Sequence, residues 1–219
     1  MGLNYEQIRQ CRDEVERELF MVANHDHCKR FHEETQLTAV VFLLIRCTSL
    51  LDSLVLIFQS RNLDGFQPVL RAFEESWNLA HELRLKEQRA KAIKWLAEAN
   101  NTYLASIPVL NEFVKSRGDH QPPLGRDYGS LSELSHPTRS AAMNSVGTAL
   151  LRLGSEGAEA EFRRAEENDQ LRIPYALHRL IWLVIDQDDP RFISMPADTN
   201  HMQLAMKFFE AYGMVDSSP

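Results

Sequence analysis

The chain has 219 residues, of which 44% are hydrophobic and 25% are charged, and its formal net charge is −7. A chain of this length can bury a hydrophobic core without disulfides or metals, so we expect a globular protein. The acidic balance repels a phosphate backbone and argues against nucleic acid as a partner. Three cysteines without a Cys-x-x-Cys spacing indicate free thiols in a reducing compartment, not a disulfide framework.

The N-terminal residues become acidic and amphipathic at once, without the apolar core of a signal peptide, so we expect a cytoplasmic protein. One segment, 37–58, is apolar and long enough to cross a bilayer. Arg46 and Asp52 lie near its middle, and each costs about 3 kcal/mol inside a membrane-spanning helix. We therefore expect a buried core helix and no membrane partner. Both charged side chains then need partners on neighbouring helices.

Apolar residues recur along the chain with helical periodicity, and no convincing run alternates as a half-buried strand would. The pattern predicts an all-α protein, a single-domain helical bundle of about seven to nine helices with short connections between antiparallel neighbours. The predicted helices cover residues 4–24, 33–61, 66–85, 87–100, 102–117, a short segment ending at His136, 138–153, and segments centred on 176–186 and 200–212.

One turn and one domain boundary can be placed from local composition. Gly65 is predicted to stop the helix over 33–61, and Pro68 is predicted to lie in the first turn of the next helix. A single domain over residues 1–219 is the simplest organisation. A weaker composition near residues 154–168 leaves open a C-terminal helical appendage over residues 158–219.

The helix predicted over residues 66–85 carries a broad polar flank beside its apolar stripe. Arg71 and Glu75 are four residues apart on this flank and can form an ion pair. One interpretation is a solvated face with weak ion pairs. The other is a half-buried pair that is held for recognition. The flank comprises Arg71, Glu74, Glu75, Asn78, His81 and Glu82.

A second polar segment runs from Tyr128 to Pro137. Because Pro137 disfavours the α conformation at the preceding residue, a helix is predicted to end at His136. Tyr128, Ser132 and Ser135 recur at helical spacing and form a hydroxyl-lined face. An imidazole beside hydroxyls and carboxylates can act as a general base or bind an anion. A capping or core histidine is the structural alternative.

Together the two segments resemble a widespread bacterial all-helical family of unknown function. That family has an Arg-x-x-x-Glu helix and a later Tyr-x-x-Leu-Ser-x-x-x-His-Pro segment, and the resemblance covers residues 38–143. It implies that Arg71, Glu75, Tyr128 and His136 converge on one site, but it assigns no reaction. We expect this site to bind a small anionic ligand or a protein partner. The apolar surplus on several helices also favours a homodimer.

The alternative function is a HEPN-like ribonuclease or nucleotide-modifying effector of a bacterial defence or toxin system. Such domains carry an arginine followed four to six residues later by a histidine. One such pair occurs, Arg172 and His178, which chance alone would produce in a chain of this composition. Pro174 inside the motif is a further departure from the pattern.

Potential metal ligands cluster at one place in the sequence. Their spacing does not supply the four well-separated ligands of a zinc site, and the paired Glu-x-x-His motifs of di-iron bundles are missing. Phosphate-binding loops and nucleophile elbows are missing as well. We therefore expect neither a metal nor a cofactor. The clustered residues are His25, Asp26, His27, Cys28 and His32.

Overall fold

The computed structural model describes residues 5–24, 35–84, 88–96, 139–169 and 172–185. Within these residues the chain is helical apart from short turns and contains no strand, so the all-α prediction is confirmed. The described helices, in chain order, are α1 (Tyr5–Asn24), α2 (Thr35–Gln59), α3 (Leu63–Leu83), α4 (Arg89–Leu96), α8 (Arg139–Arg152), α9 (Glu156–Asp169) and α10 (Arg172–Ile185).

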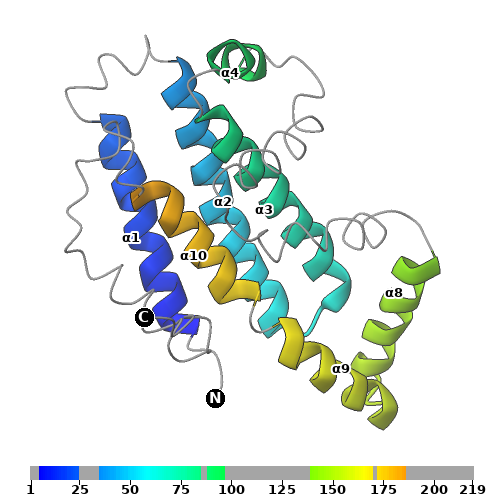
Figure 1. The fold of residues 1–219 in the computed structure, drawn as a ribbon. Coiled ribbons are helices and arrows are strands. Elements are labelled where there is room, and N and C mark those ends of the chain that lie inside the picture. The colour runs from blue at the N-terminus through cyan, green and yellow to red at the C-terminus, as the bar shows by residue number, and fades with distance from the viewer. Residues whose placement is uncertain (1–4, 25–34, 85–87, 97–138, 170–171, 186–219) are drawn as a thin grey trace, which may run out of the picture.

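Three long helices form the centre of the fold. α1, α2 and α3 lie side by side with α2 in the middle, and α10 crosses one face of this layer (Figure 1). α4 packs near the end of α3 and against α2. α8 and α9 form a helical pair at the edge of the bundle, where α8 contacts α3 (Figure 1). The arrangement brings helices from both halves of the sequence into one bundle.

One continuous hydrophobic core joins α1, α2, α3, α4 and α10. Its members recur at spacings of three and four residues, which places them on the inner face of each helix. Burial of one large apolar side chain stabilises the fold by about 1.5–3 kcal/mol. The largest fully buried side chains are those of Ile8, Leu19, Leu44, Leu51, Leu54, Phe66, Leu70, Phe73, Leu83 and Ile173.

α2 is the one described helix that is long and apolar enough to cross a membrane. Half of its most apolar window is buried inside the protein, where it packs against α1, α3, α4 and α10. This packing accounts for the buried half of its apolar side chains. Its two mid-helix charges both have partners on neighbouring helices, which are described below.

The turn between α2 and α3 corrects two predictions, the one for Gly65 and the one for Pro68. Arg61 adopts a left-handed backbone conformation with φ 59°, and this residue turns the chain after α2. Asn62 then caps α3, because its Oδ1 accepts a hydrogen bond from the backbone N–H of Gly65 at 3.3 Å. Gly65 therefore lies in the first turn of α3 and does not end α2. Pro68 lies in the second turn, where its missing N–H removes one helical hydrogen bond.

Several other predictions fall outside the described residues. The helices predicted over 102–117, before His136 and around 200–212 belong to this group, so they stay predictions. Within the described residues, α10 joins the core formed by α1, α2 and α3. The single-domain prediction and the C-terminal appendage over residues 158–219 both stay predictions.

Candidate functional site

The Arg71–Glu75 ion pair exists and is half-buried. Arg71 Nε donates to Glu75 Oε1 at 2.9 Å, and the two side chains are 16% and 26% exposed. The spacing of four residues places both side chains on the same side of α3. Glu74, beside them in sequence, is fully buried. The pair is therefore sheltered and not fully solvated, while its role in recognition stays a prediction.

The remaining polar residues of this flank are also buried. Asn78, His81 and Glu82 all have little exposed surface, with Glu82 at 1%. Burial of charged and amide groups costs free energy unless hydrogen bonds or opposite charges compensate it. This flank of α3 therefore places a row of polar side chains in the interior of the bundle. We call Arg71, Glu74, Glu75, Asn78, His81 and Glu82 the α3 ridge.

α4 supplies a counter-ion to one end of the α3 ridge. Lys91 Nζ lies 2.5 Å from Glu82 Oε1, and the lysine side chain is itself largely sheltered. A buried carboxylate that lost this cation would be left without compensation for its desolvation. The ion pair therefore fixes α4 against the C-terminal half of α3.

α10 supplies a second cation, Arg179, which is buried beside the α3 ridge. Its guanidinium carbon lies 3.5 Å from the centre of the Trp77 ring, and its Nη2 donates to Asn78 Oδ1 at 3.4 Å. Trp77 in turn donates its Nε1–H to the backbone oxygen of Arg179 at 2.9 Å. Trp77 also makes an edge contact with the His81 ring at 5.1 Å between centroids. These contacts fix α10 against α3.

Sequence reasoning missed Arg179. A usable signal exists, because Arg179 is a charged residue between Leu177 and Leu180 in an apolar helix. The same signal identified Arg46 and Asp52 in α2. A charge in such a position needs a partner on a neighbouring helix, and Arg179 has one in the α3 ridge.

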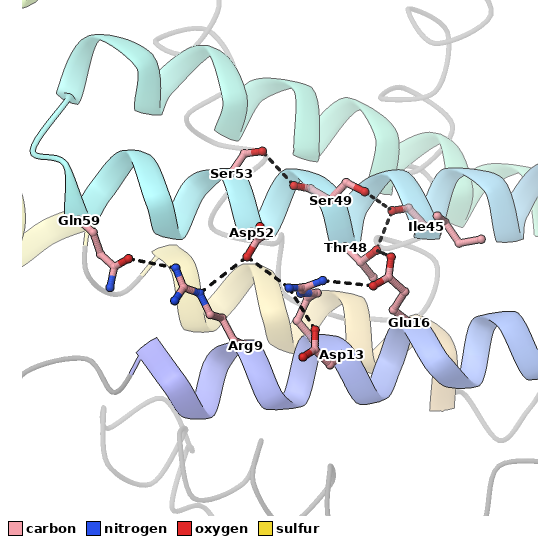
Figure 2. Close-up of polar contacts among 10 residues, drawn as sticks. Arg9, Asp13, Glu16, Ile45, Thr48, Ser49, Asp52, Ser53 and Gln59 are labelled. Atoms are coloured by element: carbon pink, nitrogen blue, oxygen red, sulfur yellow. Dashed lines mark hydrogen bonds and ion pairs between the residues drawn. The ribbon is translucent and has the colours of Figure 1, made fainter.

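The predicted partners of Asp52 lie on α1. Asp52 Oδ1 accepts a hydrogen bond from Arg12 Nη2 at 3.3 Å and lies 3.8 Å from Arg9 Nε (Figure 2). Arg12 also pairs with Glu16 at 3.1 Å, and the Thr48 hydroxyl, which donates to the backbone oxygen of Ile45 at 2.7 Å, lies 3.3 Å from the same carboxylate. This network joins α1 to α2. The prediction that Asp52 serves structural pairing is confirmed.

The predicted partner of Arg46 lies on α3. Arg46 Nε donates to Ser76 Oγ at 3.1 Å, so this charge also has a partner on a neighbouring helix. Ser49 and Ser53 donate their hydroxyls to backbone oxygens one turn earlier in α2, those of Ile45 and Ser49 (Figure 2). Both hydroxyls are thus bonded within their own helix, and they do not extend the α3 ridge.

The two described cysteines are free thiols and are buried. Burial, with a smaller contribution from Glu14, raises the pKa of Cys11 to about 11. Burial raises the pKa of Cys47 further, although Arg179 and Arg46 act in the opposite direction. Because the thiolate is the nucleophile, neither thiol is reactive near neutral pH.

Several predicted site residues lie outside the described residues. Tyr128 and His136 are two of them, so their convergence with Arg71 stays a prediction. The candidate metal ligands at residues 25–32 also lie outside, and among the described residues no group of three His, Cys, Asp or Glu side chains could hold a metal. Of the HEPN-like pair, Arg172 donates to Gln67 at 3.4 Å. That alternative function stays a prediction.

Comparisons of the chain with protein-family models, with curated proteins and with solved structures find no match. The family resemblance therefore rests on the two sequence segments alone. The α3 ridge is defined by its own geometry, whatever the family.

Proposed function

We propose that this chain is a cytoplasmic binding protein that holds an anionic group through Arg71, with Glu75 as the residue that orients the guanidinium. The anionic group belongs to a small ligand or is presented by a protein partner. Tyr128 and His136 complete the site in this proposal, since the family resemblance implies that they converge with Arg71 and Glu75.

The observation that carries the proposal is the sheltered Arg71–Glu75 pair. An arginine whose Nε is held by a carboxylate keeps its guanidinium in a fixed plane, a geometry that suits recognition of carboxylate and phosphate. Because the orientation is set before a ligand arrives, less conformational entropy is lost on binding. A fully solvated ion pair would give no such advantage.

The surroundings of Arg71 support the same function. The charges of the α3 ridge and its partners are balanced, with Arg71, Lys91 and Arg179 opposite three glutamates. The chain as a whole carries −7, so this surface repels anions less than the average surface of the protein does. Glu82 forms an ion pair with Lys91, and Arg179 donates a hydrogen bond to Asn78. Arg71 is more exposed than Arg179 of α10, so it is the arginine that a ligand reaches first.

Thermal unfolding with a panel of anions tests the proposal. The probes are inorganic phosphate, citrate, AMP and poly-glutamate, the last of which stands for an acidic protein surface. A ligand that binds only the folded state raises the Tm as its concentration rises. We expect at least one probe to raise the Tm of the wild type, Arg71→Ala to abolish the shift, and Arg71→Lys to retain only part of it.

The chain offers a matched control in the Arg12–Glu16 pair of α1. This pair has the same spacing, an N–O distance of 3.1 Å and side-chain exposures of 19% and 28%. Arg12→Ala should therefore lower stability without changing the anion-induced shift. The proposal is wrong if no probe shifts the wild type, or if Arg71→Ala and Arg12→Ala respond alike. Tyr128→Phe and His136→Ala test the two remaining residues, and each should weaken the same shift.

A further inference from the structure

α8 carries a row of exposed apolar side chains. Met143, Val146, Leu150 and Leu153 are between 42% and 82% exposed. Met143, Val146 and Leu150 lie on one face of α8, and Leu153 follows three residues later in the turn after the helix, where its backbone N–H still donates to Ala149 O at 3.1 Å. We call these four residues the α8 stripe. Ala142 and Ala149, also exposed, extend it.

The α8 stripe is the main concentration of exposed apolar surface in the described residues. It contains four of their seven exposed large hydrophobic side chains, and the other three are spread over α2 and α4. The opposite side of α8 faces the protein, because Thr148 is buried and Ser145 donates to Asp64 of α3 at 2.8 Å. An apolar row of this kind on an outer helix marks an interaction surface.

The spacing of the α8 stripe is symmetric about position 148. Residues 143 and 153 lie five positions on either side, and residues 146 and 150 lie two positions on either side. A twofold axis at this level brings two copies of α8 together in antiparallel orientation. Met143 then faces Leu153 of the second copy, and Val146 faces Leu150. An isologous interface requires this kind of self-complementary pattern.

Gly147 gives an independent indication of a close helix neighbour. It lies inside α8, where glycine is unfavourable relative to alanine. A Cβ added at Gly147 would meet nothing within 4 Å in the described part of the chain, so packing among the described residues does not require glycine. A second helix that crosses next to position 148 would require a small residue there.

Charges at the two ends of α8 suit the same arrangement. α8 contains two arginines and no acidic residue, so two copies do not bring carboxylates together along it. The turn after α8 leads into the acidic first turn of α9, which contains Glu156. In the antiparallel arrangement this turn lies near the start of α8 in the second copy, where Arg139 is found. The acidic turn of one copy therefore lies beside a helix of the second copy that contains no carboxylate.

We propose that the α8 stripe is the self-association surface of this chain, on which a second copy packs its own α8 in antiparallel orientation. The interface is small. One apolar stripe covers a few hundred Å², whereas a stable dimer buries about 800 Å² on each partner. Association is therefore concentration dependent, with a Kd of roughly micromolar or weaker.

Sedimentation velocity over a concentration series tests this surface. The wild type should shift from monomer mass toward twice that mass, and Leu150→Glu should weaken association by about tenfold or more because it places a charge in an apolar contact. Leu56→Glu on α2 is the matched control, since Leu56 is 51% exposed and receives the same charge. It should associate like the wild type. A wild type that stays monomeric throughout, or a Leu150→Glu protein that associates like Leu56→Glu, overturns the proposal.

Disulfide trapping tests the antiparallel register. The background is Cys28→Ser, so that the remaining native thiols are the buried Cys11 and Cys47. A mixture of Met143→Cys and Leu153→Cys proteins should form a mixed disulfide, whereas neither protein should cross-link to itself. The same position in two antiparallel copies is separated by ten residues of helix, about 15 Å. Self-cross-linking of Met143→Cys without mixed dimers would indicate a parallel arrangement and contradict the proposal.

Gly147→Ala distinguishes an effect on the stability of the monomer from an effect on self-association. Among the described residues of one copy the added methyl group meets open space, so the substitution should raise the Tm at low protein concentration. At high concentration it should weaken association, because the two helices can no longer approach as closely. A variant with a raised Tm and unchanged association would show that no second helix packs at position 147, and the proposal would fail.

Discussion

Arg179 and Trp77 hold each other through two different contacts. The Arg179 guanidinium lies 3.5 Å from the centre of the Trp77 ring, and the Trp77 indole donates to the backbone oxygen of Arg179 at 2.9 Å. The two residues are 102 positions apart in the chain. Their contact therefore holds α10 against α3 beside the α3 ridge.

Trp77→Phe should lower the free energy of unfolding by about 1–2 kcal/mol, because it removes the indole donor and leaves a smaller ring in the core. Urea denaturation followed by circular dichroism measures this change. Trp95→Phe on α4 is the control, since Trp95 is only partly buried against the core. Trp95→Phe should lower the free energy of unfolding by clearly less than Trp77→Phe does. Equal losses for the two variants would mean that the Arg179 contact contributes nothing specific.

Asp52→Asn should weaken the ion-pair network between α1 and α2 and lower the free energy of unfolding. The substitution keeps the shape of the side chain and removes the charge that faces Arg9 and Arg12. Because these side chains are between a fifth and a third exposed, the loss should stay below about 1 kcal/mol and shrink in high salt. A double-mutant cycle with Arg12→Ala measures the coupling. A coupling of zero at low salt would contradict a stabilising role for this pair.

Glu159 should make the attachment of α9 sensitive to acid. A hydrogen bond from Arg61 lowers the pKa of Glu159 below its ordinary value of 4.5. A carboxyl whose pKa is lower in the folded state stabilises that state above the ordinary value and loses this effect as the pH falls through the folded pKa. Glu159→Gln should therefore flatten the acid side of the stability profile. The Tm of both proteins between neutral pH and the acid transition measures the difference, and identical profiles would refute the link.

Cys11 should affect the alkaline side of the profile. Burial raises its pKa from 9.0 to about 11, so the folded state holds the thiol proton more tightly than the unfolded state does. The associated stability is complete below pH 9.0 and falls as the pH rises toward 11. Cys11→Ala should lower the Tm overall and show a shallower decline across this range. A parallel decline in both proteins would mean that Cys11 does not cause it.

The sequence predicted those parts of the fold that depend on patterns within one helix. The apolar periodicity of 37–58 identified the central helix, and the position of Asp52 inside it indicated a partner elsewhere. The turn before α3 was misplaced, because Gly65 is a common helix stop and Arg61 is not. The turn at Arg61 is closed by backbone hydrogen bonds from Arg61 to Phe58 at 2.9 Å and from Asn62 to Ile57 at 3.2 Å, and the Arg61 side chain makes contacts that are distant in sequence, with Glu159 at 2.6 Å and Phe162 at 4.4 Å.

Of the candidate site, the Arg71–Glu75 contact is the part that the sequence predicted and the described residues show. Helical spacing indicated the Arg71–Glu75 pair, because that contact is local. The burial of Glu74 and Glu82 could not be read from the sequence, since both would look the same on a solvated face. Their burial depends on which helices pack against α3, and that information lies in tertiary contacts such as the one from Lys91 of α4.

The short turn between α2 and α3 has a consequence for the order of folding. α2 and α3 pack against each other along their length and are joined by only three residues, so their contacts close small loops and cost little chain entropy. α10 reaches the same core from about a hundred residues away, as the Trp77–Arg179 contact shows. We therefore expect the α2–α3 hairpin to act as the nucleus and α10 to dock late. The polar residues of α3 would then meet water early in folding and become buried only when α10 arrives.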